Sequence, residues 1–233
     1  MIKKNYLEDL NYSKKPFIIY KSNKGFDLYT DFSKKIILTN NNVEKFINES
    51  TKLKSKKKET DLFIGFFGYK ILNNLIGVKV KKQKGLKFPE GIFYKPESKV
   101  KLPNKLNYKN LGIVKSNKLF KININKVSYK VIFDKFKKKI KSGETYQIKI
   151  CTKYSNKTQI DALDFFCRLV KTNMAPEAFM IKDKDYSIIS CSPENLINKK
   201  SDLITTKPIA GTLKKTKKLN KIKALAFFKK NIK

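Results

Sequence analysis

Histidine and tryptophan are absent from this 233-residue sequence, and Arg168 is the only arginine among its 54 basic residues. Without histidine, a transition-metal site would lack its commonest protein ligand. Arginine is the side chain that contacts guanine and phosphates bidentately, so its scarcity argues against a sequence-specific nucleic-acid binder. The three cysteines, Cys151, Cys167 and Cys191, have no metal-ligand spacing, and their odd number gives no disulfide framework.

Long hydrophobic segments are missing as well. The longest apolar run, "LFIGFFGY", is too short to span a bilayer. The first residues, "MIKKNYLEDLNYSKK", contain no apolar core of a signal peptide. We therefore expect no membrane partner and a location in the reducing cytoplasm.

Lysine and hydrophobic residues dominate what is present. The formal net charge is +35, while 40% hydrophobic and 12% aromatic residues are enough to fill a core. The lysines are spread along the whole chain, so we interpret most of them as a solvated surface that also attracts small anions. A non-catalytic basic protein that binds nucleic acid remains an alternative of another class, and its binding would collapse as the salt concentration rises.

Strand-like and helix-like segments alternate, which predicts an α/β or α+β architecture. Strand patterns occur in "PFIIYKS", "GFDLYTD", "KKIILTN", "ETDLFIGFFGYKI", "TYQIKICTKY", "AFMIKD" and "YSIISCS". Helix patterns occur in "NNVEKFINESTKL", "VSYKVIFDKFKKKIKSGE", "TQIDALDFFCRLVKTN" and "KLNKIKALAFFKKNIK". Gly143 is expected to end the second of these helices, and Thr158 to cap the third. Residues 80–110 are rich in lysine, glycine and proline, which predicts a long loop or a domain boundary.

Three short segments could carry chemistry: "GETYQ", "SCSPEN" and "TTKPIAGT". Glu194 follows a proline at the end of an apolar strand, a combination that often starts a helix. A carboxyl group at that place could instead donate a proton to a leaving group. By itself, Gln147 is a polar strand residue and Gly211 a turn residue.

In this order and spacing, the segments "SGETYQIKI", "NMAPEAFMI", "IISCSPENLI" and "TTKPIAGTL" resemble the chorismate-binding enzymes. These include component I of anthranilate synthase, component I of aminodeoxychorismate synthase and, more distantly, isochorismate and salicylate synthases. The resemblance implies an α+β fold of two packed, mainly antiparallel sheets with outer helices, incomplete in this chain. It also implies an amino-terminal subdomain over residues 1–112 and the first part of the chorismate-binding catalytic domain over residues 113–233.

Roles for two catalytic residues follow from the resemblance. Members of the family add a nucleophile at ring C2 of chorismate and expel the C4 hydroxyl group. Glu194 matches the glutamate of the family's Ser-Pro-Glu motif, which is implied to protonate that hydroxyl group. Gln147 stands where isochorismate synthases carry a lysine base that activates water. A glutamine there cannot deprotonate water, so the resemblance implies that Gln147 faces entering ammonia.

A substrate-binding segment is implied at Ile209, Ala210, Gly211 and Thr212, which match the family's Pro-Ile-x-Gly-Thr motif. A glycine at this place lets the substrate ring approach the backbone closely. In one branch of the aminodeoxychorismate synthases the variable residue is a lysine that attacks the substrate. Ala210 excludes that route and favours direct amination, as in anthranilate synthase. The departures "FIIYKS" and "PEAF" from the family's regulatory motifs argue against tryptophan feedback.

The leading hypothesis is component I of anthranilate synthase, which converts chorismate and ammonia to anthranilate and pyruvate, as a truncated fragment. The alternative within the family is aminodeoxychorismate synthase component I, of the para-aminobenzoate and folate branch. The resemblance implies Mg²⁺ as cofactor, with its ligands in a carboxyl-terminal half that this sequence does not contain. We therefore expect no metal ligand in this chain and no activity from it alone. The implied partner is a glutamine amidotransferase subunit that supplies ammonia.

Overall fold

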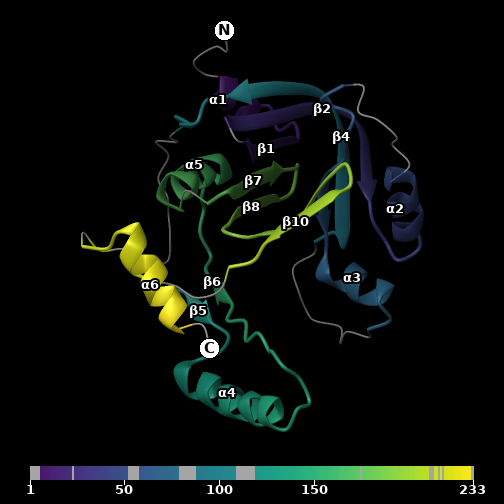
Figure 1. Ribbon diagram of the computed structural model, residues 1–233. Coiled ribbons are helices and arrows are strands. Elements are labelled where there is room, and N and C mark those ends of the chain that lie inside the picture. The colour runs from purple at the N-terminus through teal and green to yellow at the C-terminus, as the bar shows by residue number, and fades with distance from the viewer. Residues whose placement is uncertain are drawn as a thin grey trace.

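The computed structural model describes residues 6–22, 24–51, 58–78, 88–108, 119–173, 175–209, 213–214, 216 and 218–231. The described residues form an α+β fold, as the resemblance predicted (Figure 1). The helices are α1 (Tyr6–Tyr12), α2 (Val43–Thr51), α3 (Tyr69–Leu75), α4 (Lys126–Lys141), α5 (Ala162–Asn173) and α6 (Lys221–Asn231). The strands are β1 (Phe17–Ser22), β2 (Gly25–Ile37), β3 (Ile64–Phe67), β4 (Gly91–Leu102), β5 (Lys121–Ile122), β6 (Tyr154–Ser155), β7 (Glu177–Lys182), β8 (Ser187–Ser192), β9 (Asn195–Lys200) and β10 (Leu203–Lys207). No helix among these residues is long and apolar enough to cross a membrane.

One antiparallel sheet of six strands, in the order β3-β4-β2-β1-β7-β8, organises the molecule. Two further ladders, β9 with β10 and β5 with β6, have two strands each. The large sheet takes strands from both of the predicted subdomains, because β1 pairs with β7. The division at residue 112 falls outside the described residues and stays a prediction.

Side chains of β1 alternate between the two faces of the sheet, which is the normal period of a strand. Phe17 and Ile19 pack beneath α5, with its buried Leu163 and Phe166. Ile18 points to the opposite face and packs in a second cluster with Tyr29, Ile92, Tyr94 and Ile181. The sheet therefore has a buried side chain layer on both faces, and α2 and α3 enclose a third cluster at its β3–β4 end.

Strands β2 and β4 correct two predictions. The two short strands expected in "GFDLYTD" and "KKIILTN" are one strand of 13 residues, β2. The loop expected within residues 80–110 contains β4, which pairs with both β2 and β3. The register between β2 and β4 shifts between Phe32 and Lys34, opposite Pro96. Proline has no backbone N–H for a ladder hydrogen bond, and an irregularity of this kind allows it inside a sheet.

The glycine in β3 lies where the backbone of the neighbouring strand comes very close. A Cβ atom at Gly65 would lie 1.9 Å from the carbonyl oxygen of Ile92 and 2.7 Å from the Cα atom of Phe93. Both neighbours are backbone atoms of the paired strand, which cannot move without disturbing the sheet. Only glycine fits this position of β3.

Helix ends are predicted correctly for α4 and wrongly for α5. Gly143 follows α4 with a φ of +77°, the left-handed conformation that ends many helices. The cap of α5 is Asp161 and not Thr158, because the Asp161 carboxylate accepts a hydrogen bond from the backbone N–H of Asp164 at 2.8 Å. The predicted helix was therefore about one turn too long at its amino-terminal end.

The prediction of a strand in "TYQIKICTKY" is mostly wrong. Residues 146–153 form no strand, and only Tyr154 and Ser155 pair, with Ile122 and Lys121. The sequence has the alternation of a strand, but a strand also needs a neighbour to satisfy its backbone hydrogen bonds. Among the described residues, β5 is the only such neighbour, and it is two residues long.

Candidate functional site

Glu194 lies in the turn that joins β8 to β9, with its side chain exposed. The Ser192 hydroxyl group fixes this turn from within. It accepts a hydrogen bond from the backbone N–H of Glu194 at 3.3 Å and donates one to the Glu194 carbonyl oxygen at 2.9 Å. The Ser-Pro-Glu sequence therefore forms a closed local turn and does not start a helix.

The β9–β10 hairpin brings the "TTKPIAGT" segment back to this turn. Lys207 pairs with Asn195, so the chain leaves the hairpin next to Glu194. The backbone N–H of Ile209 donates a hydrogen bond to Oε1 of Glu194 at 2.8 Å. Ile209 is 54% exposed, so this link sits at the surface of the described residues.

Of the four predicted substrate-binding residues, only Ile209 can be placed. Ala210, Gly211 and Thr212 lie outside the described residues. The hydrogen bond to Ile209 nevertheless shows that two of the sequence segments, 15 residues apart, meet. Their roles toward a substrate stay predictions.

A second set of contacts, which the sequence did not reveal, orients the residue after Glu194. The Asn195 amide donates to Oε1 of Glu177 at 3.1 Å, and the Tyr20 hydroxyl group donates to Oε2 of the same carboxylate at 2.6 Å. Burial, and then the hydrogen bond to Glu177, raise the pKa of Tyr20, so the hydroxyl group keeps its proton. The contacts tie β9 to β7 and β1. The unusual "PEAF" sequence was the signal that could have indicated Glu177.

Gln147 is not brought to this turn. It is exposed, in the segment without strand structure, and its carbonyl oxygen accepts a hydrogen bond from the Thr145 hydroxyl group at 3.2 Å. Within the described part of the chain, no hydrogen bond joins Gln147 to Glu194 or Ile209. Its predicted catalytic role remains a prediction.

The carboxylates around the turn make hydrogen bonds within the chain and form no cluster of metal ligands. Mg²⁺ prefers an octahedron of oxygen ligands, usually with one or two carboxylates. Glu194 accepts from Ile209, and Glu177 from Tyr20 and Asn195. Nowhere in the described ranges do three or more histidine, cysteine, aspartate or glutamate side chains group in a way that could hold a metal.

Comparison with known proteins gives a consistent result. The profile of a family described as "chorismate binding enzyme" matches residues 6–231. Aminodeoxychorismate synthase component 1 of Bacillus subtilis is 32% identical over 93 residues, 40% of this chain and 20% of that protein. Anthranilate synthase component 1 of Buchnera aphidicola from Schizaphis graminum is 29% identical over 148 residues, 61% of this chain and 27% of that protein. Anthranilate synthase component 1 of Mycolicibacterium smegmatis is 34% identical over 90 residues, 36% of this chain and 17% of that protein. The chain thus spans less than a third of the length of these relatives.

Proposed function

This chain belongs to the chorismate binding enzyme family, and on that premise we propose that it is part of component 1 of an anthranilate synthase. The reaction joins chorismate and ammonia and releases anthranilate, pyruvate and water. The new C–N bond forms at ring C2, the C4 hydroxyl group leaves as water, and the pyruvyl group is then eliminated as the ring becomes aromatic.

The observation that supports this proposal best is the hydrogen bond between Ile209 and Glu194. It joins the proposed proton donor to the segment proposed to line the substrate ring. The Ile209 N–H contacts Oε1, so Oε2 is the oxygen that would carry the proton to the leaving hydroxyl group. The turn around Ser192 and the Glu177–Asn195 contact hold the backbone of Glu194 while its carboxyl group stays exposed to a ligand.

Residue type supports the direct addition of ammonia. The Gln147 amide has no basic atom that could deprotonate water, and Ala210 has no nucleophilic atom. We propose that Gln147 contacts the entering ammonia and that the backbone at Ala210, Gly211 and Thr212 lies against the ring. A glutamine amidotransferase subunit is the proposed source of ammonia.

Mg²⁺ stays a cofactor expected from the family, and we propose that its ligands lie outside the described residues, among which no three or more histidine, cysteine, aspartate or glutamate side chains cluster. We therefore expect this 233-residue chain alone to release no pyruvate from chorismate with ammonium and Mg²⁺. The test of catalysis belongs to the whole protein that contains this chain. Turnover by the 233-residue chain alone would contradict this expectation.

The decisive variant is Glu194→Gln, with Glu97→Gln as its control. Loss of a general acid typically lowers kcat by a factor of about 100 or more, so we expect that loss for Glu194→Gln in the whole protein, with little change in KM for chorismate. Glu97 is exposed on β4, which β2, β1 and β7 separate from β8 in the large sheet, so the same substitution there should leave kcat unchanged. Pyruvate release at the normal rate by Glu194→Gln would remove Glu194 from the proton-donor role.

Aminodeoxychorismate synthase component 1 is the second candidate, favoured by the relative from Bacillus subtilis. The two activities differ in their products. Aminodeoxychorismate retains the pyruvyl group, whereas anthranilate formation releases it. Consumption of chorismate with neither release of pyruvate nor appearance of anthranilate fluorescence would therefore favour the second candidate.

A further inference from the structure

The β9–β10 hairpin carries the two groups that meet at the candidate site. Glu194 comes directly before β9, and Ile209 follows β10 by two residues. Their hydrogen bond, together with the pairing of Asn195 with Lys207, closes the base of the hairpin. A movement of the hairpin relative to the large sheet would therefore move the proposed proton donor and Ile209 together.

Little packing fixes the position of this hairpin. In its two strands only Asn195 is half-buried, and the side chains of residues 196–200 and 203–207 are exposed. Among the described residues, one hydrogen bond joins the hairpin to the large sheet, and it runs from the Asn195 amide to Oε1 of Glu177 at 3.1 Å. The direction in which the hairpin leaves the sheet therefore depends on Glu177.

The register of the sheet brings Glu177 to a place where a second strand can hold it. Glu177 lies opposite Ser192 of β8, and Tyr20 of β1 lies opposite Phe179, two residues further along β7. Residues two apart in a strand point to the same face, so Tyr20 and Glu177 are diagonal neighbours on one face of the sheet. The Tyr20 hydroxyl group donates to Oε2 of Glu177 at 2.6 Å. One carboxylate oxygen is thus held by the sheet, and the other is directed to the hairpin.

Donor and acceptor roles make this contact selective. A carboxylate only accepts hydrogen bonds, whereas the Asn195 amide can present either its oxygen atom or its NH₂ group. With Glu177 opposite, the NH₂ group has to face the carboxylate. Hydrogen bonds to a charged acceptor are stronger than those between neutral groups, and both partners are half-buried, which limits competition from water.

We propose that Glu177 is a positioning residue, which holds the β9–β10 hairpin, and with it Glu194 and Ile209, at a fixed angle to the large sheet. Tyr20 fixes the carboxylate, and the carboxylate fixes the Asn195 amide, one residue after Glu194. The consequence for catalysis rests on the proposed function, because it requires Glu194 to be the proton donor. The hold on the hairpin does not rest on it.

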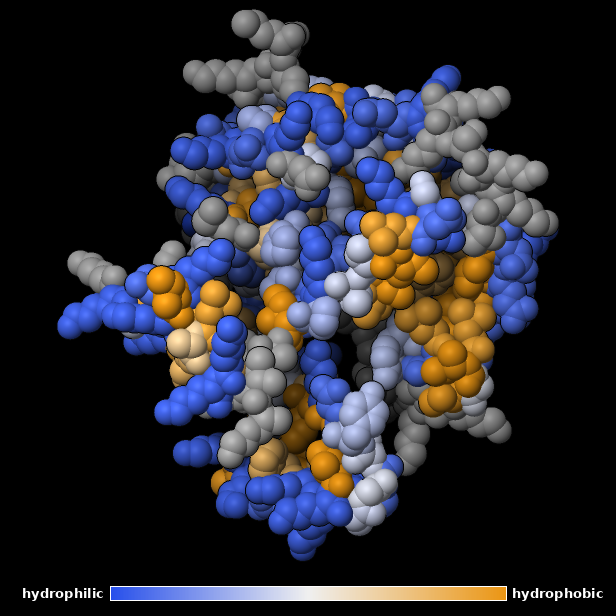
Figure 2. Space-filling model, viewed as in Figure 1, coloured by the Kyte–Doolittle hydropathy of each residue, from blue (hydrophilic) through white to orange (hydrophobic). Residues whose placement is uncertain are grey.

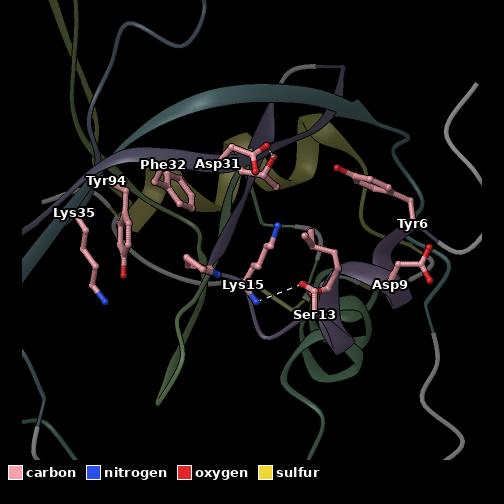
Figure 3. A pocket seen from close by; sticks show the side chains of 11 residues that line it. Tyr6, Asp9, Ser13, Lys15, Asp31, Phe32, Lys35 and Tyr94 are labelled. Atoms are coloured by element: carbon pink, nitrogen blue, oxygen red, sulfur yellow. Dashed lines mark hydrogen bonds between the residues drawn. The ribbon is translucent and has the colours of Figure 1, made fainter.

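This contact is separate from a cavity of about 600 Å³ between α1, β2 and β4, which Lys15 and Asp31 help to line (Figure 3). None of Tyr20, Glu177 and Asn195 lines that cavity. Substitutions at the contact leave the cavity lining unchanged, so their effects report on the hairpin.

Exchanging the two hydrogen-bonding groups tests the contact directly. At neutral pH, Asn195→Asp places two carboxylates against each other, which repel and have no donor between them, so the contact should break. Adding Glu177→Gln to Asn195→Asp supplies an NH₂ group from the side of the sheet, while the new amide oxygen can still accept from Tyr20. The double variant should therefore restore the contact. Asn198→Asp, the same charge change at an exposed residue of β9, is the matched control.

The first readout needs no catalysis. Nitrogen-15 relaxation of the 233-residue chain gives an order parameter for each backbone N–H, about 0.85 in rigid segments and below about 0.6 in flexible ones. We expect hairpin values close to those of β7 in the unsubstituted chain and in Asn198→Asp, lower values in Asn195→Asp, and recovery in the double variant. Unchanged values in Asn195→Asp, an equal fall in Asn198→Asp, or no recovery in the double variant would overturn the proposal.

The second readout is catalysis by the whole protein that contains this chain. Asn195→Asp should lower kcat for chorismate consumption about tenfold or more, with little change in KM, because a small displacement of a catalytic group is costly. The double variant should recover most of kcat, which a general loss of stability would not produce. Normal kcat in Asn195→Asp would overturn the positioning role and leave the proposed function intact. Absence of turnover by the unsubstituted whole protein would overturn the proposed function, and with it the role toward Glu194.

Discussion

At the scale of single residues, Asp183 is a buried carboxylate held by several hydrogen-bond donors. It is 4% exposed and accepts hydrogen bonds from Lys35 at 2.6 Å, from the Tyr186 hydroxyl group at 3.2 Å and from the Tyr94 hydroxyl group. Burial alone would raise the pKa of this carboxyl group, but the hydrogen bonds from Lys35, Tyr94 and the Lys184 backbone outweigh burial and lower it. The carboxylate thereby joins β2, β4 and the β7–β8 turn.

Replacing Asp183 tests this contribution. Because its folded-state pKa is lowered, the carboxylate stabilises the fold above the unfolded-state pKa of about 3.9, and this stabilisation is lost as the pH falls through the folded-state value. We expect Asp183→Asn to lower the free energy of unfolding in urea by about 2 kcal/mol at neutral pH, since Lys35 is partly exposed and screened by water. The difference should shrink below about pH 4. Asp185→Asn, at an exposed neighbour, should have little effect, and equal effects of the two would contradict the assignment.

At the scale of elements, two helices begin with the same kind of cap in different surroundings. Asn125 accepts a hydrogen bond from the Ser128 N–H at 2.8 Å at the start of α4, a helix with no buried residue. Asp161 accepts one from the Asp164 N–H at the start of α5, which packs on the large sheet. Asp161 also accepts from the buried amide of Asn11 at 2.7 Å, so this cap is tied to α1 as well.

The two caps should therefore contribute differently to stability. Asn125→Ala should lower the free energy of unfolding by about 1 kcal/mol or less, the usual effect of losing a cap. Asp161→Ala should lower it by about 2 kcal/mol or more, because it also leaves the buried Asn11 amide without one of its acceptors. Urea denaturation of the two variants measures the difference, and a larger loss for Asn125→Ala would show that α5 is not tied to the core through its cap.

At the scale of the whole molecule, strong positive charge coexists with exposed apolar side chains. Figure 2 shows hydrophobic side chains gathered over the β9–β10 hairpin and over the nearby α3. On the hairpin these are Leu196, Ile197, Leu203 and Ile204. Exposed apolar groups of this kind favour association, whereas the net charge of +35 keeps copies of the chain apart.

Salt should therefore promote self-association. Raising NaCl from about 0.05 M to about 0.5 M screens the charge repulsion but leaves the apolar contacts intact, so sedimentation should show a shift to larger species. Ile204→Ser should reduce this shift if the hairpin is the contact. Ile222→Ser, at an exposed residue of α6, is the control, and a stronger effect of the control would place the contact on α6.

The family, the α+β class and the elements with local signals could all be predicted from the sequence. The side-chain period predicts the strands β7 and β8 and the helix α2, and Gly143 predicts the end of α4. Both signals depend on only a few neighbouring residues. The order of the four motif segments along the chain was enough to indicate the family, because this order can be seen in the sequence without a structure.

Features that depend on partners distant in the chain became visible only in the folded structure. Residues 146–153 have the alternation of a strand but pair with no strand among the described residues. Pro96, in contrast, lies inside a strand because the irregularity between Phe32 and Lys34 accommodates it. Three other features likewise join separate segments. They are the hydrogen bond between Glu194 and Ile209, the contacts of Glu177, and the cavity that Lys15 and Asp31 help to line. The physical reason is that a backbone hydrogen bond or a buried charge is stable only when its partner is in place, and a local pattern does not specify a distant partner.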